Sequence, residues 1–159
     1  MPKKPFYFPL LLVAALCLLA ACEKDPRYMS PQKYLSQSPW KLTFSQSITS
    51  EGGKPDDTVD YYAQMDSCQQ DVLYVYASNG NYYSEPGARR CPGQSLEPKD
   101  LGRWKYEAKT KTLIIDGAGR LLWQVLALND TALQLRLTYA LQDSLRAATV
   151  TEEQHFIHP

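Results

Sequence analysis

The sequence has little of what enzymes, metal sites and nucleic-acid-binding proteins are built from. It has two histidines, His155 and His158, whose spacing along a strand points them to opposite faces. It contains no Gly-x-Ser-x-Gly, no phosphate-binding loop, no His-Glu-x-x-His and no EF-hand calcium loop. The 17 basic and 17 acidic residues balance, and the basic residues are scattered along the chain. We therefore expect no enzymatic activity, no metal, no cofactor and no nucleic-acid partner.

Long apolar runs are also scarce, and the one that exists lies at the N-terminus. Lys3 and Lys4 precede residues 6–21, which are apolar apart from Tyr7, and small residues end the run just before Cys22. The run is shorter than the roughly 20 residues that cross a bilayer as a helix. A basic start, a short apolar segment and a small-residue end predict an export signal.

The end of this signal, Leu-Ala-Ala-Cys at residues 19–22, resembles the lipobox of bacterial lipoproteins. The resemblance implies that residues 1–21 are a cleaved signal peptide and that Cys22 carries the lipid. Residues 22–30 then form a lipidated tether, and residues 31–159 form a single domain. Two or more acyl chains anchor a protein stably, so we expect attachment to the outer membrane, on its periplasmic face or at the cell surface. The alternative is a soluble secreted protein with a chance cysteine.

The remaining cysteines fit an oxidising compartment. Cys17 is lost with the signal and Cys22 is used for lipid, which leaves Cys68 and Cys91. An even remainder in an exported protein favours one disulfide between them. Two free thiols or a metal-binding pair are the alternatives, although no histidine and no third cysteine of the domain lies near them in the sequence.

Beyond residue 30 the sequence pattern is that of short strands separated by turns. Ser30 and Pro31 predict the start of a short helix over residues 32–36. Alternation of apolar and polar residues predicts the strands, which cover residues 40–48, 58–62, 72–77, 81–84, 102–107, 112–115, 120–128, 132–139 and 145–157. Asn79-Gly80 predicts a hairpin turn with a positive φ at both residues. Residues 85–99 form a long loop that the disulfide would pin.

These strands follow one another with tight turns, and no helical pattern is long enough for a βαβ unit. The pattern therefore favours an all-β fold, an antiparallel up-and-down meander that closes as a barrel or packs as a sandwich. About eight strands suffice for a small closed barrel, which holds either its own side chains or one small ligand.

The order of several motifs resembles the small lipocalin-like domains of Gram-negative bacterial lipoproteins. The matching pieces are Trp-Lys-Leu-Thr at 40–43, Cys-Gln-Gln-Asp at 68–71, Asn79-Gly80, Cys91, Gly-Arg-Trp at 102–104 and a closing hairpin at 126–137. The resemblance implies an eight-stranded barrel with a short N-terminal helix, with Trp40 under the barrel floor. For most members it implies no assigned ligand. Lipocalins proper usually open on Gly-x-Trp, and here Ser38-Pro39-Trp40 replaces it, so their ligand chemistry does not transfer directly.

The candidate functional residues form an aromatic set on the predicted strands. They are Tyr74, Tyr76, Trp104, Tyr106, Trp123 and Leu135. Small-molecule pockets are mostly apolar with a few polar groups such as tyrosine hydroxyls, so we expect non-catalytic binding of a small hydrophobic or amphipathic ligand. The same rings suit a filled core equally well. The alternative is therefore a structural or protein-interaction module, with the loop at 85–99 as its contact surface and protein partners that the sequence does not specify.

Overall fold

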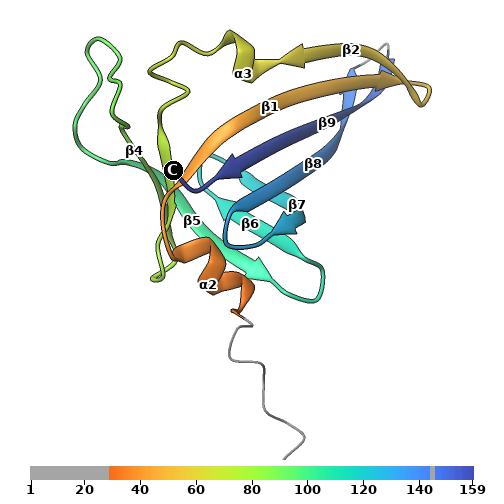
Figure 1. Ribbon diagram of the computed structural model, residues 1–159. Helices are drawn as coiled ribbons and strands as arrows, with labels where there is room; N and C mark the ends of the chain where they lie inside the picture. The colour runs from red at the N-terminus through yellow and green to blue at the C-terminus, as the bar shows by residue number, and fades with distance from the viewer. Residues whose placement is uncertain (1–28, 144–145) are drawn as a thin grey trace, which may run out of the picture.

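The structure is a computed structural model in which residues 29–143 and 146–159 are described (Figure 1). The expected signal peptide, Cys22 and most of the expected tether lie outside the described residues. In the part of the chain that is described, no helix is both long and apolar enough to span a membrane.

The domain is one antiparallel sheet of nine strands that closes on itself. The strand order is β2-β1-β3-β4-β5-β6-β7-β8-β9, and β1 also pairs with β9. The strands are β1 (Trp40–Glu51), β2 (Lys54–Asp60), β3 (Leu73–Tyr76), β4 (Asn81–Glu85), β5 (Lys99–Glu107), β6 (Thr112–Asp116), β7 (Arg120–Leu128), β8 (Ala132–Asp143) and β9 (Arg146–Ile157). All except β2 form a closed eight-stranded barrel, in which each strand neighbours the next. The predicted up-and-down barrel is confirmed.

The strand β2 lies along the distal half of β1, on the edge that β3 occupies nearer the start of β1. The predicted strand over residues 58–62 is wrong at both ends, because β2 begins at Lys54 and stops at Asp60. The Asp60 carboxylate accepts a hydrogen bond from the Ala63 N–H at 2.9 Å and caps the short helix α3 (Tyr61–Gln64). A side chain that caps the backbone in this way competes with continued strand pairing, so Tyr61 and Tyr62 are helical.

The short helix α2 (Pro31–Ser36) begins where the sequence predicts it. The Ser30 hydroxyl accepts a hydrogen bond from the Lys33 N–H, and Pro31 occupies the first turn. Leu35 is completely buried, and its carbonyl accepts a hydrogen bond of 3.0 Å from the indole Nε1 of Trp40. The helix α2 therefore covers one end of the barrel, and it lies there in Figure 1.

The two ends of the barrel differ in their connections. At the end that α2 covers, which we call the closed end, the strands are joined by short turns at residues 77–80, 108–111 and 129–131. The opposite end, which we call the open end, carries the segment 61–72, the loop 86–98 and the turn 117–119. The hairpins β1–β2 and β8–β9 also turn at the open end, where they extend beyond the other strands (Figure 1).

The hairpin at Asn79-Gly80 is confirmed, but its turn differs from the prediction. Gly80 has a φ of +86°, whereas Asn79 does not have a positive φ. The Gly80 N–H donates to the Ala77 carbonyl and the Ala77 N–H donates to the Asn81 carbonyl, each at 2.9 Å. This is a three-residue loop that places a single residue in the left-handed region. The Asn79 side chain instead accepts a hydrogen bond from the Asn81 N–H at 3.0 Å.

The disulfide between Cys68 and Cys91 is confirmed, with the two Cα atoms 5.2 Å apart. It joins the segment 61–72 to the loop 86–98 at the open end. The two longest connections of the domain are therefore covalently tied to each other.

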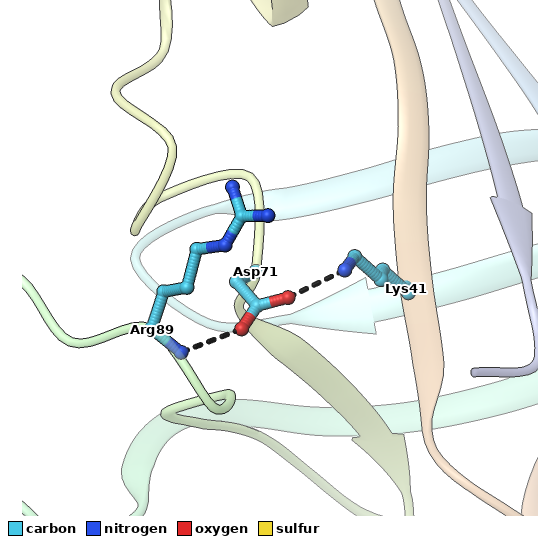
Figure 2. Close-up of polar contacts among 3 residues, drawn as sticks. All are labelled: Lys41, Asp71 and Arg89. Carbon is cyan, nitrogen blue, oxygen red and sulfur yellow. Dashed lines mark hydrogen bonds and ion pairs between the residues drawn. The ribbon is translucent and has the colours of Figure 1, made fainter.

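Asp71 ties the same region to the barrel wall (Figure 2). Its carboxylate accepts hydrogen bonds from the Lys41 ammonium on β1 and, at 2.7 Å, from the backbone N–H of Arg89. These two bonds, the one from Lys41 first, hold the pKa of Asp71 below its ordinary value. Asp71 thus fastens the loop 86–98 to the start of β1.

Candidate functional site

A cavity of about 560 Å³ lies inside the barrel toward the open end. Each of the eight barrel strands contributes at least one side chain to its lining, and the turn 117–119 contributes Gly117, Ala118 and Gly119. Its volume falls within the range of roughly 300 to 1,000 Å³ that is typical of small-molecule sites. The barrel interior is therefore packed only in part.

The lining of this cavity carries no charged side chain, and its polar side chains are three tyrosines and Gln154. A second hollow of about 570 Å³ lies beneath the loop 86–98, but its lining includes Glu85, Glu97 and Lys99. The described part of the chain brings together no group of three or more metal-ligating side chains. The barrel cavity is thus the site best suited to an apolar molecule.

The three cavity tyrosines form a stacked group. The rings of Tyr76 and Tyr82 are stacked with centroids 4.7 Å apart, and those of Tyr74 and Tyr82 are 6.4 Å apart. Burial is the main cause that raises the pKa of each phenol above its ordinary value. All three hydroxyls are therefore neutral at physiological pH and able to donate hydrogen bonds.

Tyr76 differs from the other two in its hydroxyl. The residue is 1% exposed, and within the described structure its hydroxyl is buried without a hydrogen-bond partner. The Tyr82 hydroxyl is close enough to lower the pKa of Tyr76 as a weak hydrogen-bonding neighbour, against the larger effect of burial. The contact between the two hydroxyls nevertheless lies outside ordinary hydrogen-bond geometry. A buried polar atom without a partner is rare in native proteins, and Tyr76, which carries this one, is among the residues that line the cavity.

The rim of the cavity lies where β7 and β8 part. Their pairing ends at Gln124 and Arg136, although β7 continues back to Arg120 on β6 and β8 continues to Asp143 on β9. Apolar side chains are exposed beside this gap, with Leu121 40% exposed, Leu122 52% and Tyr139 39%. Leu121 pairs with Ile115, and both line the cavity, so this side of the rim is apolar.

Four of the six sequence-predicted cavity residues lie in the cavity wall. These are Tyr74, Tyr76, Trp123 and Leu135. The other two, Trp104 and Tyr106, do not line this cavity. The indole Nε1 of Trp104 donates to the Ala77 carbonyl at 2.8 Å, beside the turn of the closed end, and Tyr106 follows it toward that end.

Trp40 lies at the closed end, as the sequence predicts for a residue under the barrel floor. It is fully buried, and the ring of His158 packs against it with centroids 3.8 Å apart. The His158 Nδ1 lies 3.0 Å from the Pro39 carbonyl, which fixes the ring there. Trp40 therefore takes no part in the cavity lining.

Several lining residues were not predicted from the sequence. Tyr82 and Phe156 lie on strands with the correct inward alternation, a signal that would have included them. Gly117, Ala118 and Gly119 gave no signal beyond a turn. A Cβ atom on Gly117 would lie 2.3 Å from the Leu101 carbonyl oxygen, so the absence of a side chain permits the close approach of the turn 117–119 to β5.

The sequence matches no protein-family profile and no curated protein. Among solved structures it is similar to the complex of bovine odorant-binding protein with undecanal, at 13% identity and a TM-score of 0.43, over 86% of this chain and 77% of that one. The bovine protein complexed with its natural ligand gives 13% identity, a TM-score of 0.40 and the same coverage. Its deswapped triple mutant gives 12% and 0.38, over 79% of this chain and 74% of that one. Likenesses at this level assign neither a family nor a ligand.

Proposed function

We propose that this protein binds a small hydrophobic or amphipathic molecule inside its barrel, without catalysis, while anchored by lipid to the outer membrane. The observation that carries the binding proposal is the cavity of about 560 Å³ with its apolar, uncharged lining. Burial of apolar ligand surface in such a space is favourable by about 25 cal/mol per Å². A filled barrel would have left no such space.

The binding proposal is tested at the rim with two matched variants. Leu121 and Leu122 are neighbours on β7, and both are exposed, but Leu121 lines the cavity whereas Leu122 does not. We expect Leu121→Trp to weaken binding of an apolar ligand at least tenfold, because the larger ring occupies the rim. Leu122→Trp is the control and should leave the affinity unchanged.

Native mass spectrometry of the purified protein, incubated with a lipid extract of its source, measures this binding. A discrete added mass that the Leu121→Trp variant loses and the Leu122→Trp variant keeps would support binding in the cavity. An unaltered protein mass across the whole extract would contradict it.

The anchoring proposal rests on the Leu-Ala-Ala-Cys motif at residues 19–22, outside the described residues. The disulfide between Cys68 and Cys91 is consistent with an exported protein. We expect Cys22→Ser to abolish acyl labelling and membrane association. The control is Cys17→Ser, which changes the other N-terminal cysteine and should keep both; a Cys22→Ser protein that is still acylated would contradict the anchor.

The second candidate function, a protein-interaction module, draws on the loop 86–98. Leu96 in this loop, which the disulfide joins to the segment 61–72, is 62% exposed. One exposed apolar residue in a loop does not indicate an interface, because scattered exposed apolar residues are normal on soluble proteins. Binding in the cavity is therefore the function that the geometry favours.

A further inference from the structure

Tyr76 is held rigidly at the inner end of the cavity. It is the last residue of β3 toward the closed end, and its ring stacks on Tyr82 and meets the Trp104 ring edge-on, with centroids 5.7 Å apart. These two contacts fix the direction of the phenol. The hydroxyl therefore cannot turn out to solvent to satisfy its hydrogen bonds.

The hydroxyl without a partner raises the free energy of the folded, ligand-free protein. A buried hydroxyl has lost its water and, in the described structure, gains no protein partner in return. Tyr76 is itself one of the residues that line the cavity, although its hydroxyl is buried within the wall. A ligand atom that accepts its proton would remove this cost, whereas a hydrocarbon would leave it in place.

The charge of the ligand is limited by the same lining. No lysine, arginine or histidine lines the cavity, so a carboxylate or phosphate placed inside would be desolvated without a cation to pair with. A buried cation would likewise meet no carboxylate. The raised pKa of Tyr74, Tyr76 and Tyr82 keeps the phenols neutral, so they supply no charge either.

From this arrangement we infer that the cavity selects an uncharged apolar molecule with one hydrogen-bond-accepting oxygen, such as a ketone, aldehyde or ester, which the Tyr76 hydroxyl binds at the inner end. This inference rests on the proposed binding function and specifies the ligand class of that site. The apolar remainder of the ligand extends toward the rim at Leu121.

The test compares octane, 2-octanone and octanoate, three probes of equal chain length, by isothermal titration calorimetry and tryptophan fluorescence. Trp123 in the cavity wall provides the fluorescence signal. Because the three probes differ in their own solubility in water, the informative quantity is the ratio of the octane and 2-octanone dissociation constants, compared between variants. Octanoate should bind more weakly than 2-octanone.

The decisive variant is Tyr76→Phe, which keeps the ring and removes the hydroxyl. We expect it to shift the ratio against 2-octanone by roughly five- to tenfold, because the ketone loses its donor while octane loses nothing. The matched control is Tyr106→Phe, a buried tyrosine outside the cavity, which should leave the ratio as in the parent protein.

The outcomes separate the ligand class from the binding function. A ratio that Tyr76→Phe leaves unchanged, or octanoate binding as tightly as 2-octanone, overturns the inferred ligand class while binding itself stands. Failure of all three probes to bind overturns both. A shift confined to Tyr76→Phe supports the assignment of this hydroxyl.

Discussion

The two ends of this barrel are built from the same strands but are filled differently. At the closed end the largest side chains are fully buried, with Leu35 and Trp40 at 0% exposure and Leu113 and Leu133 likewise. At the open end the turn 117–119 contributes only small residues to the cavity lining, and the buried positions farther along β1 are Ser45 and Ser47. The difference lies in the size of the side chains at the inward positions, which on β1 change phase at a bulge between Leu42 and Phe44.

The strand β1 shows this gradient within one element. Its inward positions begin with Trp40 and Leu42 and continue with the buried Ser45 and Ser47. Ser45 pairs with Gln154, which lines the cavity. Large side chains near the start of β1 fill the barrel interior at the closed end. Small side chains farther along β1 leave space in the interior.

The largest effect is expected from removing the central side chain of the closed end. Trp40→Ala should lower the free energy of unfolding by about 3–5 kcal/mol, because it leaves a cavity and removes the donor to the Leu35 carbonyl. Phe44→Ala on the outer face of β1, where the ring stacks on His155, is the control and should cost about 1 kcal/mol. Urea unfolding measures both, and equal losses would contradict the assignment of Trp40 to the closed end.

The open end is expected to depend on its covalent tie rather than on packing. Replacing both Cys68 and Cys91 by serine should lower the unfolding free energy by about 3 kcal/mol, because the 24-residue loop becomes free in the unfolded chain. Reduction of this disulfide in the parent protein should lower its unfolding free energy by the same amount. A double variant with an unchanged urea midpoint would show that the contacts of Asp71 alone hold this region.

The strands were largely predictable from the sequence, because inward and outward residues alternate along them. Residues 120–128 match β7 at both ends, and Ser30-Pro31 marked the start of α2. Two of the errors arose where a side chain competes with the backbone pattern. Asp60 caps α3 and ends β2 at residue 60. The Asn79 side chain accepts a hydrogen bond from the Asn81 N–H, and Asn79 does not have the positive φ that was predicted.

The site was predictable only in part, because alternation indicates the interior face but not the depth. Trp104 and Tyr76 both point inward from neighbouring parts of the wall, and their rings touch. Tyr76 lines the cavity and Trp104 does not, because the Trp104 indole binds the Ala77 carbonyl at the closed-end turn. That difference depends on which end of the barrel α2 covers, and the sequence of a single strand does not show which end that is.

A smaller effect of opposite sign is expected at the boundary between the two ends. Tyr76→Phe should raise the unfolding free energy of the ligand-free protein by about 1 kcal/mol, because it removes a buried hydroxyl that has no partner. Tyr106→Phe should bring no such gain, since Tyr106 is not without a partner. Thermal unfolding of both variants decides the point, and a loss of stability in Tyr76→Phe would show that its hydroxyl is bonded in solution.

The smallest effect concerns the pH dependence of the open end. The pKa of Asp71 is lowered from 3.8 in the folded protein, chiefly by the hydrogen bond from Lys41. The carboxylate therefore stabilises the fold fully above about pH 3.8, and this contribution disappears as the pH falls through the lower, folded-state pKa. Asp71→Asn should be less stable than the parent protein at pH 7, and the gap should narrow below pH 3.8.

The matched control for this titration is Asp116→Asn. Asp116 and Arg120 form an ion pair of 3.7 Å with side chains 58% and 65% exposed, and an exposed pair of this kind contributes little. If Asp71→Asn followed the parent protein at every pH, as Asp116→Asn is expected to do, the Lys41–Asp71–Arg89 contacts would not hold the open end. The disulfide between Cys68 and Cys91 would then be the main constraint on the open end.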